Sequence, residues 1–232
     1  KVSGLRFEGI CLRYSNWHQP ENDFLPVDDL PPSERPIAAS IQGSVCTGAT
    51  IETECAEKCA FIDCAVRHTG NYGMHIGFGC REMTIQGGDF RDLGAGAIKL
   101  RGGDLDEAPW KRTGMCSLTD NRIVQAGRVF HSAVGILLAH TFENVVAHNH
   151  IEDLYYTAIS VGWSWGYREH ATRDNLILHN RIRRVGQGLL SDLGAIYLLG
   201  VQPGTVIYGN HVSELELRHY GGWGIYLDEG AS

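Results

Sequence analysis

Four segments of this chain repeat one pattern, in which a short apolar strand is followed by an Asn and then by further apolar positions. An earlier segment, residues 84–90, fits the same pattern with Gly88 in the place of the Asn. A repeat of about 30 residues indicates one structural unit copied along the chain, which limits the fold to repeat architectures. The asparagines are spaced 28, 31 and 30 residues apart, and they are Asn121, Asn149, Asn180 and Asn210.

A second short strand follows each of these turns and is centred on a small residue before an Ile. Residues 73–76 belong to the same series, one turn earlier. A short strand with one apolar face cannot bury that face alone, whereas stacked copies form a continuous core and pair their backbone groups. The Ile positions are Ile98, Ile136, Ile159, Ile196 and Ile225.

These features predict an all-β fold, a right-handed parallel β-helix (solenoid), with residues 1–232 as a single domain. The recurrent Asn predicts a corner with left-handed backbone, and stacked side-chain amides that hydrogen-bond along the coil axis. Loop excursions are expected near 14–36, which holds five prolines, and near 101–113. Because the chain starts and stops within the repeat, we expect it to be part of a larger chain.

Composition excludes several classes of partner. The net charge is −7, and the basic stripe that nucleic acid binding requires is absent from the sequence. No apolar run approaches the roughly 20 residues of a membrane span. The seven cysteines lack the spacing of a zinc site, so we expect mostly buried thiols, and the sequence predicts neither a metal nor a cofactor. It does not indicate an oligomeric state.

One row of side chains is expected to face outward, because alternation places the residue after each Ile opposite the core. A single aromatic ring in such a place is more often packed beneath a loop, but several on one flank favour a sugar, whose C–H faces stack on rings. The row is Lys99, Leu137, Ser160, Tyr197 and Tyr226, and the aromatic residues near it are Trp163, Trp165, Tyr167, Tyr220 and Trp223.

Two acids lie on the same flank, Asp192 before one strand and Asp228 after the next. Glycoside hydrolysis needs two carboxyl groups, and coils about 4.8 Å apart can bring them to catalytic separations. We therefore expect loops to bring Asp192 and Asp228 together over an aromatic groove, with Glu229 as the alternative catalytic acid. His140 is a candidate ligand for sugar hydroxyls. The competing interpretation is that these acids are solvated loop residues.

Two other functions stay open on the residues alone. Lys99 and Arg101 would suit a polysaccharide lyase acting on uronates, in which a cation neutralises the sugar carboxylate. Cationic side chains are sparse on the later coils, so the lyase ranks second. A non-catalytic carbohydrate-binding β-helix is the other alternative, and a structural adhesin or tail-spike segment is disfavoured by the clustered acids and aromatics.

Several segments resemble the right-handed β-helix glycoside hydrolases of family 141, whose members include α-L-fucosidases and xylanases. The resemblance implies a secreted or periplasmic bacterial glycosidase that degrades plant cell-wall polysaccharides by a retaining, two-carboxylate mechanism, with an oligo- or polysaccharide as its partner. It places the two catalytic aspartates on Asp192 and Asp228. The expected substrate-binding residues are His140, Trp163, Trp165, Tyr197, Trp223 and Tyr226, and the matching segments are 61–79, 92–99, 161–167, 192–197, 200–206 and 220–232.

Overall fold

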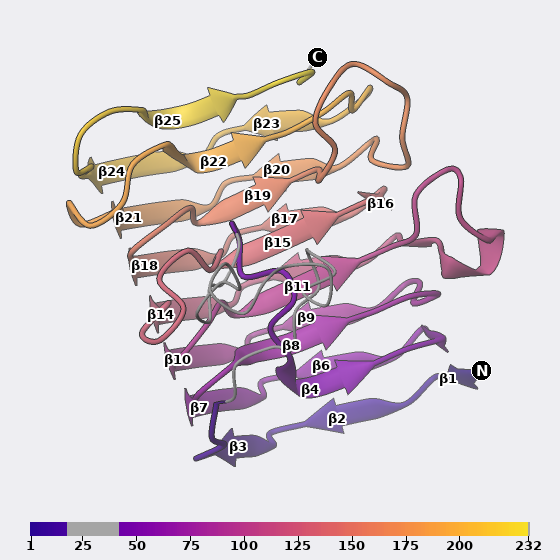
Figure 1. Ribbon diagram of the computed structural model, residues 1–232. Coiled ribbons are helices and arrows are strands. Elements are labelled where there is room, and N and C mark those ends of the chain that lie inside the picture. Colours follow the sequence, from indigo (N-terminus) through magenta and orange to yellow (C-terminus); the bar gives the residue numbers. More distant parts are fainter. Residues whose placement is uncertain (18–41, 232) are drawn as a thin grey trace, which may run out of the picture.

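The computed structural model describes residues 1–17 and 42–231, and they form a stack of coils built from three parallel sheets (Figure 1). The first sheet has the order β2 (Arg6–Glu8), β6 (Ala60–Ile62), β9 (Thr84–Gln86), β13 (Ser117–Thr119), β17 (Val145–Ala147), β20 (Leu176–Leu178) and β23 (Val206–Tyr208). The second has β3 (Cys11–Arg13), β7 (Ala65–Thr69), β10 (Asp89–Leu93), β14 (Arg122–Ala126), β18 (His150–Leu154), β21 (Arg181–Val185) and β24 (His211–Leu215).

The third sheet has the order β4 (Ala49–Thr53), β8 (Tyr72–Ile76), β11 (Ile98–Arg101), β15 (Ile136–Ala139), β19 (Ile159–Val161), β22 (Leu193–Leu198) and β25 (Gly222–Leu227). Two short parallel pairs add β1 (Val2–Ser3) to β5 (Ala56–Glu57) and β12 (Thr113–Gly114) to β16 (Thr141–Phe142). Each coil contributes one strand to every sheet, so the predicted parallel β-helix is confirmed.

The helical content of the described residues is one 3-10 turn, η2 (Pro109–Lys111). It lies in the segment between β11 and β12, which projects from the coil stack (Figure 1). Of the other predicted excursion, residues 18–36 lie outside the described residues. Among the described residues, no helix has the length and apolar character needed to cross a membrane.

The predicted Ile positions stack on one another in the third sheet. Ile98 pairs with Ile136, and the series continues through Ile159 and Ile196 to Ile225. One coil earlier the position opposite Ile98 is Met74, so it is Met74 and not Ile76 that holds this place in residues 73–76. The stack is buried up to Ile196, which makes it the centre of the core along the axis.

The predicted asparagine ladder is confirmed at the corner between the first and second sheets. The Asn149 side-chain oxygen accepts both the backbone N–H and the side-chain N–H of Asn121, at 3.0 and 2.9 Å. Asn180 does the same for Asn149, and Asn210 for Asn180. Gly88 ends the ladder by donating its backbone N–H to Asn121.

The prediction that the Asn itself has left-handed backbone is wrong. The positive φ belongs to the residue before each Asn, for example 59° at Asp120 and 57° at His148. Asp and His tolerate this conformation more readily than β-branched residues do. The preceding residue makes the turn, which leaves each Asn free to direct its amide along the coil axis.

A second ladder, absent from the sequence-based prediction, lies at the other end of the first sheet. Asn144 accepts the Cys116 backbone N–H at 3.0 Å, and Asn175 accepts the backbone and side-chain N–H groups of Asn144. Asn144 and Asn175 precede the Asn of the first ladder by five residues each. Amide ladders therefore fix both ends of β17 and β20.

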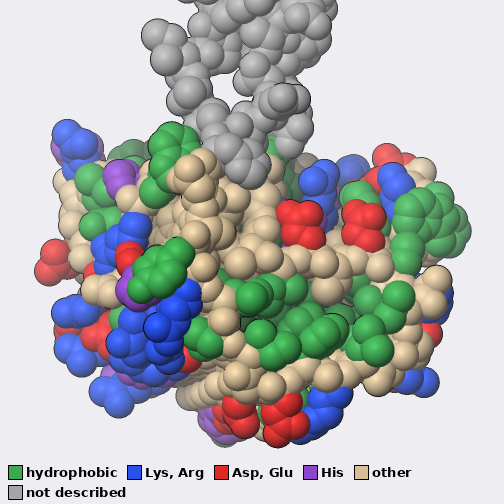
Figure 2. Space-filling view, turned by 90° about the horizontal axis from the view of Figure 1, so that it is seen from below, with side chains coloured by type: hydrophobic (Ala, Val, Ile, Leu, Met, Phe, Trp, Pro, Cys, Tyr) green, Lys and Arg blue, Asp and Glu red, His purple; other side chains and the backbone are tan. Residues whose placement is uncertain are grey.

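Hydrophobic side chains gather on the face of the N-terminal coil, as Figure 2 shows. A cavity of about 460 Å³ between the first coil and the next is lined by Val2, Leu5, Phe7, Ile10 and Leu12 among others.

Replacing Asn149 by Ala should destabilise the fold strongly. Asn149 is 1% exposed, and its loss leaves the Asn121 backbone N–H and the Leu118 carbonyl buried without their partner. Each unsatisfied group costs about 1–3 kcal/mol, so we expect a loss of about 2–4 kcal/mol in the free energy of unfolding, measured by denaturant titration.

Asn210→Ala is the matched control. Asn210 makes the equivalent bonds to Asn180 and Ile177 but is partly exposed, so water can replace them. We expect it to lose less than half as much stability. Equal losses for the two variants would show that burial of the ladder is not what makes it stabilising.

Candidate active site

The outer face of the third sheet carries the predicted row of side chains in the expected register. Lys99 pairs with Leu137, Leu137 with Ser160, Ser160 with Tyr197 and Tyr197 with Tyr226. The row is nevertheless buried from Lys99, which is 2% exposed, up to Tyr197, which is 3% exposed. Tyr197, predicted to bind substrate, therefore has almost no exposed surface, and Tyr226 is the one partly exposed member of the row.

The cover is residues 42–47, which we call the strap. It runs across the outer face of the third sheet, where Gly43 forms a parallel bridge with Ala133 and accepts a hydrogen bond from the Tyr72 hydroxyl at 2.6 Å. The Lys99 ammonium donates to the carbonyls of Val45 and Thr47 at 2.7 and 2.8 Å. Lys99 lies on the outward side of the sheet as predicted, but the strap covers it and its ammonium group is hydrogen-bonded there.

Above the strap, two tyrosines and two aspartates form a compact group. Tyr197 and Tyr226 lie one coil apart with ring centroids separated by 4.9 Å. The Tyr197 hydroxyl donates a short hydrogen bond to the Asp228 carboxylate, and the Tyr226 hydroxyl donates to Asp192 Oδ1 at 3.3 Å. Trp223 packs on Tyr226 with ring centroids 3.9 Å apart.

The backbone explains how acids at opposite ends of neighbouring strands converge. Asp192 adopts left-handed backbone, with φ of 58°, immediately before β22. Asp228 follows β25 and prolongs its ladder, because its N–H donates to Leu198 O at 2.9 Å. Tyr226 lies between them, and its own hydroxyl is close to both carboxylates.

The pKa of Tyr226 is affected by both acids. Burial raises the pKa of Tyr226, and the charges of Asp192 and Asp228 and hydrogen bonds to both raise it further. Hydrogen bonds from two adjacent tyrosines therefore hold the two carboxylates on one flank of the sheet, Asp228 by Tyr197 and Asp192 by Tyr226.

Tyr156 and Gln42 are site residues that the sequence did not indicate. The Tyr156 hydroxyl donates to the Asp192 backbone carbonyl at 3.0 Å and accepts from Gln42 Nε2 at 2.9 Å. Burial raises the pKa of Tyr156 to about 12, with the charges of Asp192 and Asp228 adding to the effect. Gln42 could not be found from the repeat because it lies on the strap, outside the coil pattern.

Two of the three tryptophans predicted to bind substrate lie on the loop after β19. Trp163 and Trp165 meet edge to face with centroids 5.2 Å apart, and Trp165 is half exposed. Their loop reaches the last coil, since Gly230 has no room for a side chain beside the Gly166 carbonyl. Glu229, the alternative acid, is exposed, and its described contact is the carbonyl that accepts from the Gly200 N–H.

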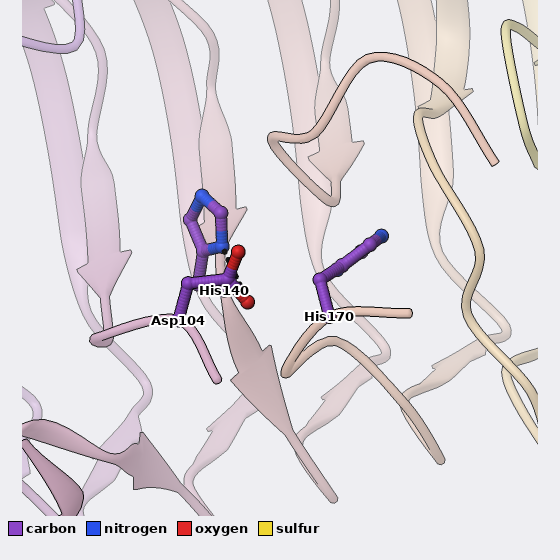
Figure 3. A group of neighbouring side chains, drawn as sticks. All are labelled: Asp104, His140 and His170. Carbon is purple, nitrogen blue, oxygen red and sulfur yellow. Dashed lines mark ion pairs between the residues drawn. The ribbon is translucent and has the colours of Figure 1, made fainter. Parts of the chain in front are cut away.

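His140 lies apart from the two acids. It follows β15, three coils from β25 in the third sheet, which corresponds to roughly 14 Å along the axis. With Arg101, Glu107 and Trp163 it lines a separate cavity of about 370 Å³. His140 is instead close to Asp104 and His170, which the sequence did not group with it (Figure 3).

The group of three is held by the loops after β11, β15 and β19. Asp104 accepts the backbone N–H groups of Leu105 and Ala171 and pairs with Arg168 at 2.6 Å. Burial would raise the pKa of Asp104, but these N–H donors and the guanidinium outweigh it and lower the pKa to about 2. The Asp104 carboxylate is therefore a fixed negative charge at neutral pH.

The fold and the paired acids define a parallel β-helix with a tyrosine-rich dicarboxylate site. Neither a family model nor a curated protein sequence matches this chain. A solved structure named "Glycoside hydrolase" matches with a TM-score of 0.65 at 16% sequence identity, over 78% of this chain and 38% of that one. The likeness establishes the shared fold, and this chain spans well under half the length of that protein. Membership of family 141 stays a prediction.

Removing the Lys99 charge should loosen the strap. In Lys99→Met the carbonyls of Val45 and Thr47 lose their shared ammonium donor, and we expect a loss of about 2–3 kcal/mol in the free energy of unfolding. Limited proteolysis should cut near the strap faster than in the unmodified protein.

Lys58→Met is the control, because Lys58 is exposed and its ion pair with Glu82 is long, at 4.0 Å. It should change neither stability nor cleavage. If Lys99→Met is cut at the same rate as Lys58→Met, Lys99 does not hold the strap on the sheet.

Proposed function

We propose that this protein is a retaining glycoside hydrolase that uses Asp192 and Asp228. The observation that carries the proposal is a pair of adjacent tyrosines whose hydroxyls donate to the two carboxylates, Tyr197 to Asp228 and Tyr226 to Asp192. Hydrolysis with retention needs one carboxylate as nucleophile and one carboxyl group as acid and base, close enough to act on the same sugar carbon.

The hydrogen bonds suggest how the roles are divided. Asp228 accepts a hydrogen bond from the Tyr197 hydroxyl, which fixes the orientation of its carboxylate. A nucleophile has to be held in line with the sugar carbon, so we assign that role to Asp228. Asp192 has a single, longer hydrogen bond to its carboxylate from Tyr226, at 3.3 Å, and takes the role of acid and base.

Exposed aromatic rings beside the acids support a sugar as the ligand. Trp223 is 40% exposed and packs on Tyr226, and Trp165 stands on the neighbouring loop. Rings of this kind offer apolar faces to the C–H surface of a sugar. We propose a plant cell-wall glycan, fucosidase- or xylanase-like in type, and a secreted or periplasmic location. Both follow from the resemblance to family 141.

The competing uronate lyase is weakened by the position of Lys99, because its ammonium is buried beneath the strap. A non-catalytic carbohydrate-binding β-helix would bind the glycan without releasing a product, unlike the hydrolase and the lyase. A screen of aryl fucosides, xylosides and arabinosides together with polyuronates therefore separates the three: released phenol supports the hydrolase, an unsaturated product from a polyuronate supports the lyase, and binding alone supports the binding module.

Single amide substitutions of the two acids should abolish hydrolysis without unfolding the protein. Asp192→Asn and Asp228→Asn should each lower kcat about 1,000-fold or more. Stability should be unchanged or should rise by about 0.5–1 kcal/mol, because repulsion between two neighbouring carboxylates is relieved. Asn also tolerates the left-handed backbone at position 192.

Asp120→Asn is the control, an exposed aspartate with the same left-handed backbone at a distant corner, with φ of 59°. It should leave kcat unchanged. Azide added to Asp228→Gly should yield a glycosyl azide of inverted configuration if Asp228 is the nucleophile, because azide then attacks the sugar carbon directly. NMR of the product of the unmodified protein should instead show retained anomeric configuration. Inverted product from the unmodified protein, or full activity in Asp192→Asn, would contradict the assignment.

A further inference from the structure

Three side chains suited to metal binding meet on the edge of the third sheet, away from the two acids. Asp104, His140 and His170 come from the loops after β11, β15 and β19, which are successive strands of that sheet. One potential ligand atom from each lies within 4.8 Å of the others. Asp104 and His170 are 5% and 4% exposed, so the group is shielded from bulk water.

Figure 3 shows how the side chains lie. One ring nitrogen of His140 approaches the Asp104 carboxylate, while His170 lies beside this pair with its ring directed away from it. His140 Nδ1 is 3.4 Å from Asp104 Oδ1. The three residues come from three different loops, and one potential ligand atom of each lies within 4.8 Å of the others.

Two imidazole nitrogens in this group are buried without a well-formed hydrogen bond among the described residues: His170 Nε2, and His140 Nδ1, whose neighbour is Asp104 Oδ1 at 3.4 Å. His170 Nδ1 accepts only a long hydrogen bond from the Thr172 backbone N–H, at 3.3 Å. A buried polar atom without a partner is costly, and such atoms are uncommon in folded proteins. Their presence on two neighbouring histidines indicates a ligand that accepts nitrogen lone pairs.

The donor set selects the class of ligand. Two imidazoles and one carboxylate suit Zn²⁺ and other divalent transition metals, whereas Ca²⁺ and Mg²⁺ prefer oxygen donors throughout. Around Zn²⁺ the donor atoms lie roughly 3.3 Å apart, so the group has to contract by at most about 1.5 Å. The three residues lie on loops, where such a movement does not disturb the sheet.

Arg168 is the residue that a cation would have to replace. Its guanidinium pairs with Asp104 Oδ2 at 2.6 Å, but its side chain is 57% exposed and can turn to solvent. Asp104 Oδ1 would stay oriented by the N–H groups of Leu105 and Ala171, as hydrogen bonds commonly orient a metal-bound carboxylate. Arg168 therefore neutralises Asp104 when no cation does.

We propose that Asp104, His140 and His170 bind a divalent transition-metal ion such as Zn²⁺, which displaces Arg168 from Asp104. The ion joins three loops of successive coils. His140 also lines the cavity with Arg101 and Glu107, which gives the ion a route in from solvent and leaves room for water on the metal. The proposal concerns binding and does not depend on hydrolysis by Asp192 and Asp228.

The test is calorimetric titration of the purified, metal-stripped protein with Zn²⁺, with the cobalt spectrum as a second readout. One ion should bind per chain, raise Tm with concentration, and be removed by EDTA. Asp104→Asn, His140→Ala and His170→Ala should each weaken binding at least about 100-fold. His211→Ala, which removes an exposed histidine of β24, should bind as the unmodified protein does.

Arg168→Ala separates a metal site from a purely structural ion pair. If Arg168 competes with the metal, its removal should tighten Zn²⁺ binding about tenfold, because Zn²⁺ then has no guanidinium to displace from Asp104. Far-UV circular dichroism establishes that each variant is folded. Failure of the folded, unmodified protein to bind, or weaker binding by folded Arg168→Ala, would overturn the proposal.

Discussion

Register between coils is the constraint on which the rest of this molecule depends, and two ladders of buried amides enforce it. The Asn149 side-chain oxygen accepts hydrogen bonds from the backbone and side-chain N–H groups of Asn121, and Asn149 donates its own two to Asn180. A slip of the register by one residue would therefore leave several buried groups unpaired. Asn144 and Asn175 repeat the arrangement five residues earlier. With both ends of the first sheet fixed, residues about 30 apart in sequence are brought to one position in neighbouring coils.

The candidate active site follows from that register. Tyr197 and Tyr226 hold the same place in successive strands, so their rings meet and their hydroxyls reach the carboxylates of Asp228 and Asp192. The rigid sheet thus holds the two carboxylates on one flank, each bound by the hydroxyl of one of these tyrosines. The strap confines it to the upper coils, because Lys99 anchors the strap over the lower part of the same row.

The repeat predicted this architecture because the spacing of Asn121, Asn149, Asn180 and Asn210 records the length of one coil directly. It also predicted the pairing from Ile98 to Ile225, since alternation along a strand depends on local sequence alone. The repeat could not predict which side chains of the outward-facing row are accessible to solvent. Lys99 occupies the expected outward position, yet residues 42–47 cover it, and the strap shows no repeat that could be aligned with the coils.

The sequence by itself determined the parallel coil stack, its Asn ladder and the two acids at opposite ends of neighbouring strands, because each is a property of one strand or of the period between strands. The tertiary structure decided which part of the outer face is open and which side chains meet there. It added Tyr156 and Gln42 to the acids and gathered Asp104, His140 and His170 from three loops. Loops vary in length and have no period, so the contacts between them are fixed only when the coils are stacked.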